Sequence, residues 1–263
     1  MEDEYVSVVL PRDEAKRYLL LSSNFGESKS LEHLLDIQQK VQLYIKHIEN
    51  SFIKADSKQS KNCDGIFLIY GHSGVKTRCF YNNMGELPNM RYLEIGVLNG
   101  SSTCSMLYKN KIDCLAIDNF SEFEGSFEPF KANIEKYGGH NNINFICQDC
   151  WSVDARTLGK FNVYLFDGPH EEEDHYKALH NYSACLDDVF IYIVDDWNWT
   201  KVRSGTHNAI KNNNLRIAFK KEIKTTTDNT QPEWDEFVWP RAGPTSDWHN
   251  GICVFVLIKN EVL

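Results

Sequence analysis

Acidic side chains follow two long apolar runs of the chain. Asp167 comes directly after residues 163–166. The pair Asp195 and Asp196 comes directly after residues 190–194. We expect each run to be a buried strand, and ligands of an open α/β sheet bind at the carboxyl ends of its strands. Three bare carboxylates there would repel one another, so this arrangement predicts a divalent cation with oxygen ligands, such as Mg²⁺.

A glycine turn follows an earlier apolar run. Gly96 and Gly100 allow the backbone to come close to a ligand. The dinucleotide fingerprint G-x-G-x-x-G is not met, because Leu98 stands at its middle glycine and Glu94 lies two residues before the first one. A carboxylate there would repel a pyrophosphate and attract a cation. The turn predicts a pocket for a cationic nucleoside cofactor, and a tight strand-to-helix turn of any α/β protein is the alternative.

The pattern E-x-G-x-x-x-G resembles the first motif of class I S-adenosylmethionine-dependent methyltransferases. That cofactor carries an ammonium and a sulfonium group and no phosphate. The resemblance implies that Asp118 accepts the ribose hydroxyls and that Asp149 binds the adenine amino group, although either residue could instead only cap a turn or helix. The cofactor-binding residues implied in this way are Glu94, Gly96, Gly100, Ser101, Asp118, Asn119, Asp149 and Asp167.

The acids after the two apolar runs resemble the metal site of the catechol-type and the macrolide or aminocoumarin-sugar O-methyltransferases. The resemblance implies that Asp167, Asp195 and Asp196 bind Mg²⁺. It makes Asp167 and His170 the catalytic residues, because His170 stands where catechol-type enzymes have a lysine base. The sugar-modifying relatives use an acid at the position of Pro169. A loop histidine without a catalytic role and a strand-end acid without a metal are the alternatives.

The implied activity is a Mg²⁺-dependent O-methylation of a small hydroxylated molecule or of a sugar hydroxyl. The methyl group would pass directly from sulfonium to oxygen, so that catalysis rests on positioning and charge stabilisation. A metal-independent methyltransferase, a hydroxylase-like relative and a non-catalytic binding module of the same fold stay open as alternatives.

The elements that position these residues alternate along the chain from residue 91 onward. We expect strands at residues 91–95, 113–117, 143–147, 161–166 and 189–194, and helices at 101–109, 126–137, 172–186 and 202–213. This order predicts a Rossmann-like, doubly wound α/β sheet with helices on both faces. Residues 215–224 and 251–258 predict a closing hairpin, and the resemblance implies one antiparallel strand near the C-terminus of a mostly parallel sheet.

The segment before this alternation predicts an N-terminal helical extension over residues 1–64, followed by the methyltransferase domain over 65–263. Apolar residues at helical spacing predict an amphipathic helix over 30–53, and the polar residues 54–64 predict an exposed connection. Residues 65–70 predict a strand or a buried turn. The helix could form a homodimer or only cover the edge of the sheet.

The segment 225–250 is rich in polar residues yet contains Trp234, Phe237, Trp239 and Trp248. A loop of this length with so many aromatic residues either folds over the domain or serves as a lid or partner surface. We expect it to shape the substrate pocket.

The composition limits the partners. The chain has 263 residues and a net charge of −9, which opposes tight binding to nucleic acid. No apolar run is long enough to span a membrane, and the acidic residues 1–4 do not start a signal peptide, so we expect a cytoplasmic protein. The eight cysteines are expected to be reduced. Cys147 and Cys150 form a C-x-x-C motif without the second pair that a zinc ribbon needs.

Overall fold

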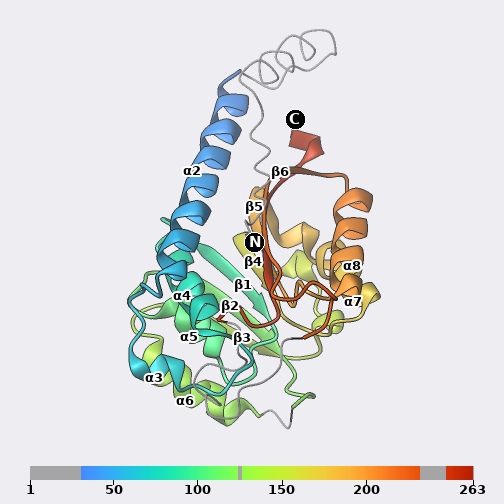
Figure 1. Cartoon of the computed structure of the whole chain (residues 1–263). Coiled ribbons are helices and arrows are strands. Elements are labelled where there is room, and N and C mark those ends of the chain that lie inside the picture. Colours follow the sequence, from blue (N-terminus) through green and yellow to red (C-terminus); the bar gives the residue numbers. More distant parts are fainter. Residues whose placement is uncertain (1–30, 124–125, 232–246, 263) are drawn as a thin grey trace.

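A seven-stranded sheet forms the centre of the protein, and the computed structural model describes residues 31–123, 126–231 and 247–262 (Figure 1). The strands are β1 (Arg91–Ile95), β2 (Asp113–Asp118), β3 (Asn142–Cys147), β4 (Phe161–Phe166), β5 (Leu186–Asp195), β6 (Leu215–Ile223) and β7 (Ile252–Lys259). Their order is β3-β2-β1-β4-β5-β7-β6. The order reverses between β1 and β4, and ligands of open α/β sheets bind at the carboxyl ends of the strands at such a switch point.

The direction of the strands confirms the sequence prediction. β1 pairs in parallel with β2 and β4, and the parallel pairs β2–β3 and β4–β5 extend the sheet on either side. β7 runs antiparallel to both of its neighbours, β5 and β6. The fold is therefore a Rossmann-like, mostly parallel sheet with one antiparallel strand, and β6 and β7 form the predicted hairpin.

Helices cover both faces of the sheet (Figure 1). They are α2 (Leu31–Asp56), α3 (Asp64–Phe67), α4 (Val75–Met84), α5 (Ser101–Leu107), α6 (Phe127–Tyr137), α7 (Glu172–Tyr182) and α8 (Thr200–Asn212), with short 3₁₀ turns at Cys150–Ser152, Ala155–Thr157, Ser183–Cys185 and Asn260–Val262. α2 and α4 share one core with Leu165 of β4, whereas α7 and α8 share the other with Tyr164 and Phe166. Because side chains alternate along a strand, β4 contributes to both cores.

In the segment before β1, one of two expected alternatives was wrong and one helix was not predicted. Residues 65–70 do not form a strand: the short helix α3 ends at Phe67, and a turn follows that fits the alternative of a buried turn, because Ile69 is buried. The buried Arg78 donates hydrogen bonds to the carbonyl oxygens of Ile66 and Ile69. The helix α4 was not predicted at all. Its polar side chains hide the helical pattern of hydrophobicity, although Arg78 and Asn82 are fully buried and hydrogen-bonded within the protein.

The helix expected over 172–186 is shorter, and the following strand is longer. α7 ends at Tyr182, and a 3₁₀ turn leads directly into β5 at Leu186. Leu186 pairs with Phe161 of β4, while Asp187 forms an ion pair with Arg91. Local pattern reading places these residues in a helix or turn, but the pairing with β4 makes them a strand.

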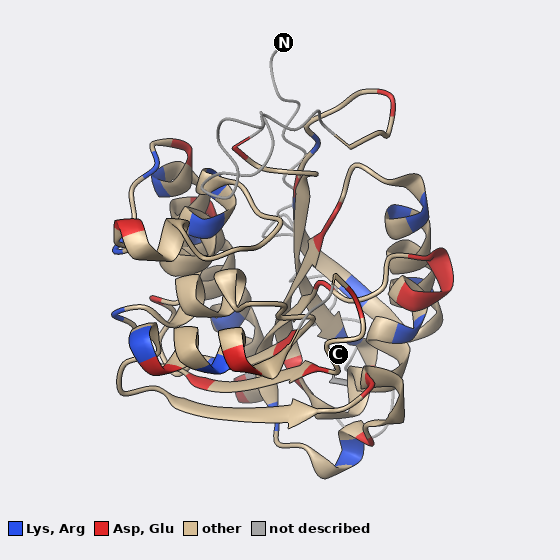
Figure 2. Cartoon of the chain, turned by 90° about the horizontal axis from the view of Figure 1, so that it is seen from below, with Lys and Arg blue, Asp and Glu red and all other residues tan. Residues whose placement is uncertain are grey.

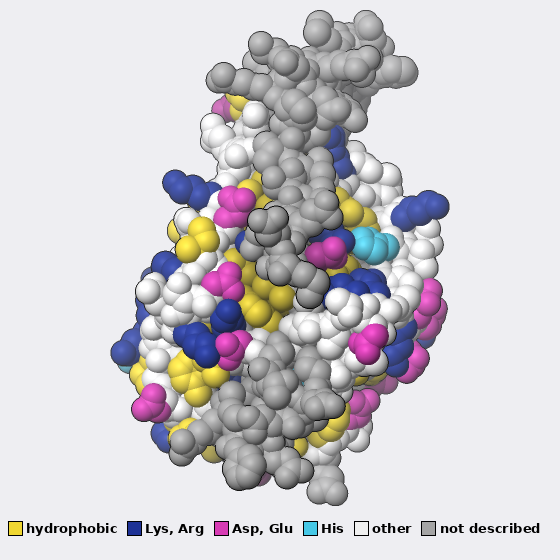
Figure 3. All heavy atoms as spheres, viewed as in Figure 1, with side chains coloured by type: hydrophobic (Ala, Val, Ile, Leu, Met, Phe, Trp, Pro, Cys, Tyr) yellow, Lys and Arg dark blue, Asp and Glu magenta, His cyan; other side chains and the backbone are white. Residues whose placement is uncertain are grey.

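The long helix α2 belongs to the same core as the sheet. Ile48 and Phe52 on its inner side are fully buried. On its outer side Leu43 and Ile53 keep 48% and 64% of their surface exposed, and Figure 3 shows hydrophobic side chains on the surface of this face. The homodimer and the domain boundary at residues 64 and 65 stay predictions. Within the part of the chain that the structure describes, no helix combines the length and apolar character needed to cross a bilayer.

Of the four Trp and Phe residues noted in the segment 225–250, the structure describes only Trp248. Trp234, Phe237 and Trp239 lie outside the described residues. Trp248 is buried, and its ring packs against Phe52 at 5.4 Å and Phe80 at 6.2 Å between centroids. Trp248 therefore belongs to the core rather than to a lid.

Candidate functional site

A cavity of about 600 Å³ opens at the carboxyl ends of the strands around the switch point. Its walls come from the ends of β1, β2, β4 and β5 and from the segment before α4. Of the residues predicted from the sequence, those that line it are Gly96, Ser101, Asp118, Asn119, Asp149, Asp167, His170, Asp195 and Asp196. A cavity of this size is typical of a small-molecule or cofactor site.

The turn between β1 and α5 requires its glycines. Gly96 and Gly100 have φ angles of +84° and +83°, which side-chain-bearing residues rarely adopt. A Cβ on Gly96 would lie 1.9 Å from the carbonyl oxygen of Asp167, so the turn can approach β4 only without a side chain. Leu98 also lies in the left-handed region, at φ 47°. The glycine pattern that the sequence displayed thus marks a real backbone constraint.

Glu94 is not part of the described cavity wall. The side chain is fully buried, and one of its carboxyl oxygens accepts a hydrogen bond from the hydroxyl of Ser102. Burial raises the pKa of Glu94 to about 7. Glu94 is not among the lining residues, so its predicted role in binding the cofactor stays a prediction.

Asp118 organises the cavity wall at the end of β2. Its Oδ2 accepts hydrogen bonds from the backbone N–H groups of Val97 and Leu98 at 2.7 and 3.0 Å, and its Oδ1 accepts one from Phe120 at 2.7 Å. The carboxylate therefore ties the glycine turn to β2. The neighbouring Asn119 lines the cavity beside it. The ribose contact that was expected of Asp118 stays a prediction.

Asp149 lies on the wall next to the end of β3. Its Oδ1 accepts a hydrogen bond from the backbone of Trp151 at 3.1 Å and caps a 3₁₀ turn. The capping role that the sequence left open is therefore present. Cys147 is exposed, and the nearby Cys150 is a free thiol whose pKa is raised to about 12 by burial. A thiol with such a pKa is not a ready metal ligand or nucleophile.

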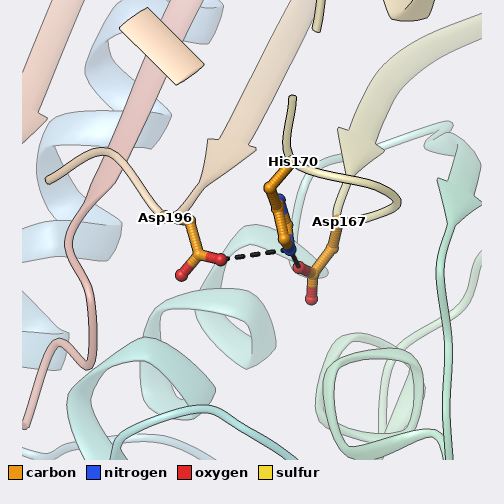
Figure 4. Close-up of side chains that lie close together, drawn as sticks. All are labelled: Asp167, His170 and Asp196. Atoms are coloured by element: carbon orange, nitrogen blue, oxygen red, sulfur yellow. Dashed lines mark ion pairs between the residues drawn. The ribbon is translucent and has the colours of Figure 1, made fainter. Parts of the chain in front are cut away.

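Asp167, His170 and Asp196 converge in the cavity (Figure 4). The Nε2 atom of His170 lies 3.1 Å from Oδ2 of Asp196 and 3.9 Å from Oδ1 of Asp167. The closest potential ligand atoms of the three residues all lie within 4.8 Å of one another. The imidazole stands between carboxylates from two neighbouring strands, as Figure 4 shows.

Asp195 occupies a different place from its neighbour Asp196. It is the last residue of β5 and only 2% exposed, and none of the described residues forms a hydrogen bond with its Oδ1. Burial and the nearby Asp196 raise the pKa of Asp195, and burial together with both acids raises the pKa of Asp167. The sequence grouped these three acids, whereas the structure replaces Asp195 by His170 in the cluster of converging side chains.

Sequence reading missed Arg78, His72, His249 and Asn250 as contributors to the site. Arg78 donates hydrogen bonds to the loop that carries His72 into the cavity wall. His249 and Asn250 precede β7, and the side-chain amide of Asn250 donates to Oδ1 of Asp196 at 2.9 Å. No motif marks these residues. The role of Arg78 follows only from its burial in the folded protein, where its guanidinium must find acceptors.

The charge of the cavity wall has one sign. Its acidic members are Asp118, Glu122, Asp149, Asp167, Asp195 and Asp196, six in all. Among the described residues that line it there is no Lys or Arg. The wall is therefore suited to cations and unsuited to phosphate groups.

No protein-family model matches the sequence, and no curated protein is significantly similar to it. The chain is similar in structure to the SAH-bound methyltransferase PaMTH1 of Podospora anserina, with 10% identity, a TM-score of 0.46 and coverage of 95% of this chain and 98% of that one. It is also similar to the ribosomal protein L11 methylase of Lactobacillus delbrueckii subsp. bulgaricus, with 14% identity, a TM-score of 0.43 and coverage of 72% and 79%. TrmN of Thermus thermophilus matches with 12% identity, a TM-score of 0.42 and coverage of 70% and 48%, about half of that chain. Similarities at this level carry no information on the acceptor.

Proposed function

We propose that this chain is an S-adenosylmethionine-dependent methyltransferase that methylates a hydroxyl group of a small molecule beside a bound divalent cation. The observation that carries the proposal is the cavity wall, which combines the β1–α5 glycine turn with six acids and has no Lys or Arg among its described lining residues. The six acids disfavour a pyrophosphate cofactor there, whereas a sulfonium and an ammonium group would be attracted.

The residues on the wall fit the parts of this cofactor. Gly96 lets the turn after β1 come close to the ligand. Asp118 holds that turn in place, and Asn119, which lines the cavity beside it, would be a contact of the nucleoside. Asp149 is available at the end of β3, where the resemblance implies the adenine contact. The cofactor would supply the methyl group, and the protein would orient it and exclude water.

A divalent cation fits the group formed by Asp167, His170 and Asp196, with Asp195 next to it. Mg²⁺ is the cation that the resemblance in sequence implies. Among the described residues of the cavity wall, only imidazoles could balance the charge of these carboxyl groups. A bound cation would supply that charge and would make a nearby hydroxyl group more acidic.

A small acceptor is favoured over nucleic acid. The acidic cavity and the net charge of −9 oppose a phosphate backbone. In the view of Figure 2, Lys and Arg are scattered among Asp and Glu rather than gathered into one basic face. The ring of Trp199, which lines the cavity beside His170, offers flat apolar surface to a small acceptor.

Calorimetric titration with S-adenosylhomocysteine tests the proposal. We expect micromolar binding and no binding of NADH. Asp118→Ala should weaken binding at least tenfold, since the turn after β1 loses its anchor. Asp154→Ala is the matched control, because Asp154 also caps a backbone N–H but does not line the cavity. Binding of NADH without S-adenosylhomocysteine would refute the proposal, and binding of neither would favour a non-catalytic module.

A screen of hydroxylated acceptors tests the second half of the proposal. Formation of S-adenosylhomocysteine is measured with and without a chelator. We expect turnover to stop when the chelator is added and to return with excess divalent cation. Turnover that a chelator does not change would refute the role of the cation and leave a metal-independent methyltransferase.

A further inference from the structure

The cluster of Asp167, His170 and Asp196 differs from an all-carboxylate site in one donor. Nε2 of His170 points to both carboxylates, and Nδ1 of the same ring is buried (Figure 4). His170 thus presents one nitrogen to the same point as two carboxylate oxygens.

The distances fit a shared cation. Ligands at about 2.1 Å from a metal ion and at right angles to each other lie about 3.0 Å apart. The two distances from Nε2 of His170 to Asp196 and Asp167 are 3.1 and 3.9 Å. Both oxygens can therefore share a coordination shell with the imidazole after a small adjustment of side chains.

A second observation comes from outside this cluster. Asp195 lines the cavity and is only 2% exposed, and its buried Oδ1 has no hydrogen-bond partner among the described residues. One imidazolium ion at His170 would balance one of the three carboxylates at the ends of β4 and β5. A dication bound beside a neutral imidazole would bring twice that charge to the same place, so the surplus of acids favours a metal over an ion pair.

The surroundings of Asp196 hold it in a ligating position. Its backbone lies in the left-handed region at φ 56°, which turns it away from the direction of β5. Its Oδ1 accepts a hydrogen bond from Asn250 at 2.9 Å and lies 3.8 Å from Nε2 of His249. The other oxygen, Oδ2, is the one that faces His170. Outer contacts of this kind orient the ligands of metal sites.

We propose that His170 is a metal ligand and that the site takes a transition-metal dication such as Mn²⁺, Fe²⁺ or Zn²⁺ in preference to Mg²⁺. Imidazole nitrogen is a good ligand for these ions, whereas Mg²⁺ prefers oxygen and keeps its waters. The inference rests on the proposed function, because it names the cation of that same site. It assigns to His170 the place that the sequence gave to Asp195, and it removes His170 from the role of general base.

The test measures metal binding without any cofactor. The full chain is freed of metal with a chelator, desalted, and titrated calorimetrically with Mn²⁺ and with Mg²⁺. We expect Mn²⁺ to bind at least tenfold more tightly than Mg²⁺. His170→Gln should reduce the affinity for Mn²⁺ at least tenfold and leave the affinity for Mg²⁺ nearly unchanged. His140→Gln is the matched control, because His140 is exposed and does not line the cavity.

A second variant keeps the test independent of the folding of the first. His170→Asp replaces nitrogen by oxygen and should bring the affinities for Mn²⁺ and Mg²⁺ closer together. The inference is overturned if Mg²⁺ binds the unmodified chain as tightly as Mn²⁺, or if folded His170→Gln binds Mn²⁺ as the unmodified chain does. The second result would return His170 to the role of a base.

The two proposals fail in different ways. S-adenosylhomocysteine is titrated into the same metal-free samples. Binding of S-adenosylhomocysteine together with equal affinity for the two metal ions refutes only the inference on His170. Preferential binding of Mn²⁺ without binding of S-adenosylhomocysteine supports the metal site and refutes the methyltransferase proposal.

Discussion

Arg78→Lys is a sharp test of how the cavity wall is built. Arg78 is fully buried in α4, and burial lowers the pKa of its guanidinium to about 10, which leaves it charged at neutral pH. It donates five hydrogen bonds, each of 2.8 to 3.2 Å, to the segment before α4; the acceptors are the carbonyl oxygens of Ile66, Phe67, Ile69 and Gly71 and the hydroxyl of Ser73. Gly71 and Ser73 line the cavity. Arg78 therefore fixes one wall of the site from behind.

The magnitude follows from the number of donors. A lysine ammonium has three N–H groups, so at least two of the five acceptors lose their partner. A hydrogen bond to a charged group contributes about 1.5–3 kcal/mol, so we expect a loss of at least about 3 kcal/mol of unfolding free energy. For a protein of this size that corresponds to a fall in Tm of about 6–12 °C.

Thermal unfolding and titration with S-adenosylhomocysteine form the assay. We expect Arg78→Lys to lower both the Tm and the affinity, since the loop with Gly71 and Ser73 loses its anchor. Arg156→Lys is the control, because Arg156 is exposed and pairs only locally with Asp154. The reasoning would be refuted if Arg78→Lys left both the Tm and the affinity as they are in the unmodified chain.

Three further predictions concern single groups. Gly96→Ala should abolish binding of S-adenosylhomocysteine and lower the Tm, because the new Cβ would lie 1.9 Å from the carbonyl oxygen of Asp167 in a backbone with φ +84°. Calorimetric titration measures the affinity, and an affinity equal to that of the unmodified chain would show that the turn can relax. The pKa of Glu94 is raised from 4.5 to about 7, so the folded state holds its proton more tightly and loses stability as pH rises through that range. Relative to Glu94→Gln, the metal-free chain should lose about 2 kcal/mol of unfolding free energy between about pH 5 and 8, measured by denaturant titration, and parallel pH profiles would contradict this assignment. Alkylation at mildly alkaline pH should label the exposed Cys147 well before Cys150, whose pKa is raised to about 12. Mass spectrometry of timed samples measures the order of labelling, and earlier labelling of Cys150 would contradict this prediction.

The fold could be predicted where the hydrophobic pattern of a segment agrees with the burial of that segment in the folded protein. Apolar runs marked β1, β2 and β4, because strands in the middle of a parallel sheet are buried on both faces. The helix α4 escaped because its buried face carries Arg78 and Asn82, whose polarity is compensated by carbonyl groups elsewhere in the chain. Hydrophobic periodicity cannot detect a buried face of this kind.

The sequence by itself determined the glycine turn after β1 and the acids after β4 and β5. These are local features, and the carboxyl ends of parallel strands necessarily lie at one edge of a sheet. Only the tertiary structure decided which side chains meet there. Asp195 and Asp196 are neighbours in sequence, yet the backbone turn at Asp196 brings that carboxylate to His170 and leaves Asp195 behind it. Asn250 reaches Asp196 across 54 residues of chain, and a contact over such a distance exists only once the hairpin of β6 and β7 has joined β5.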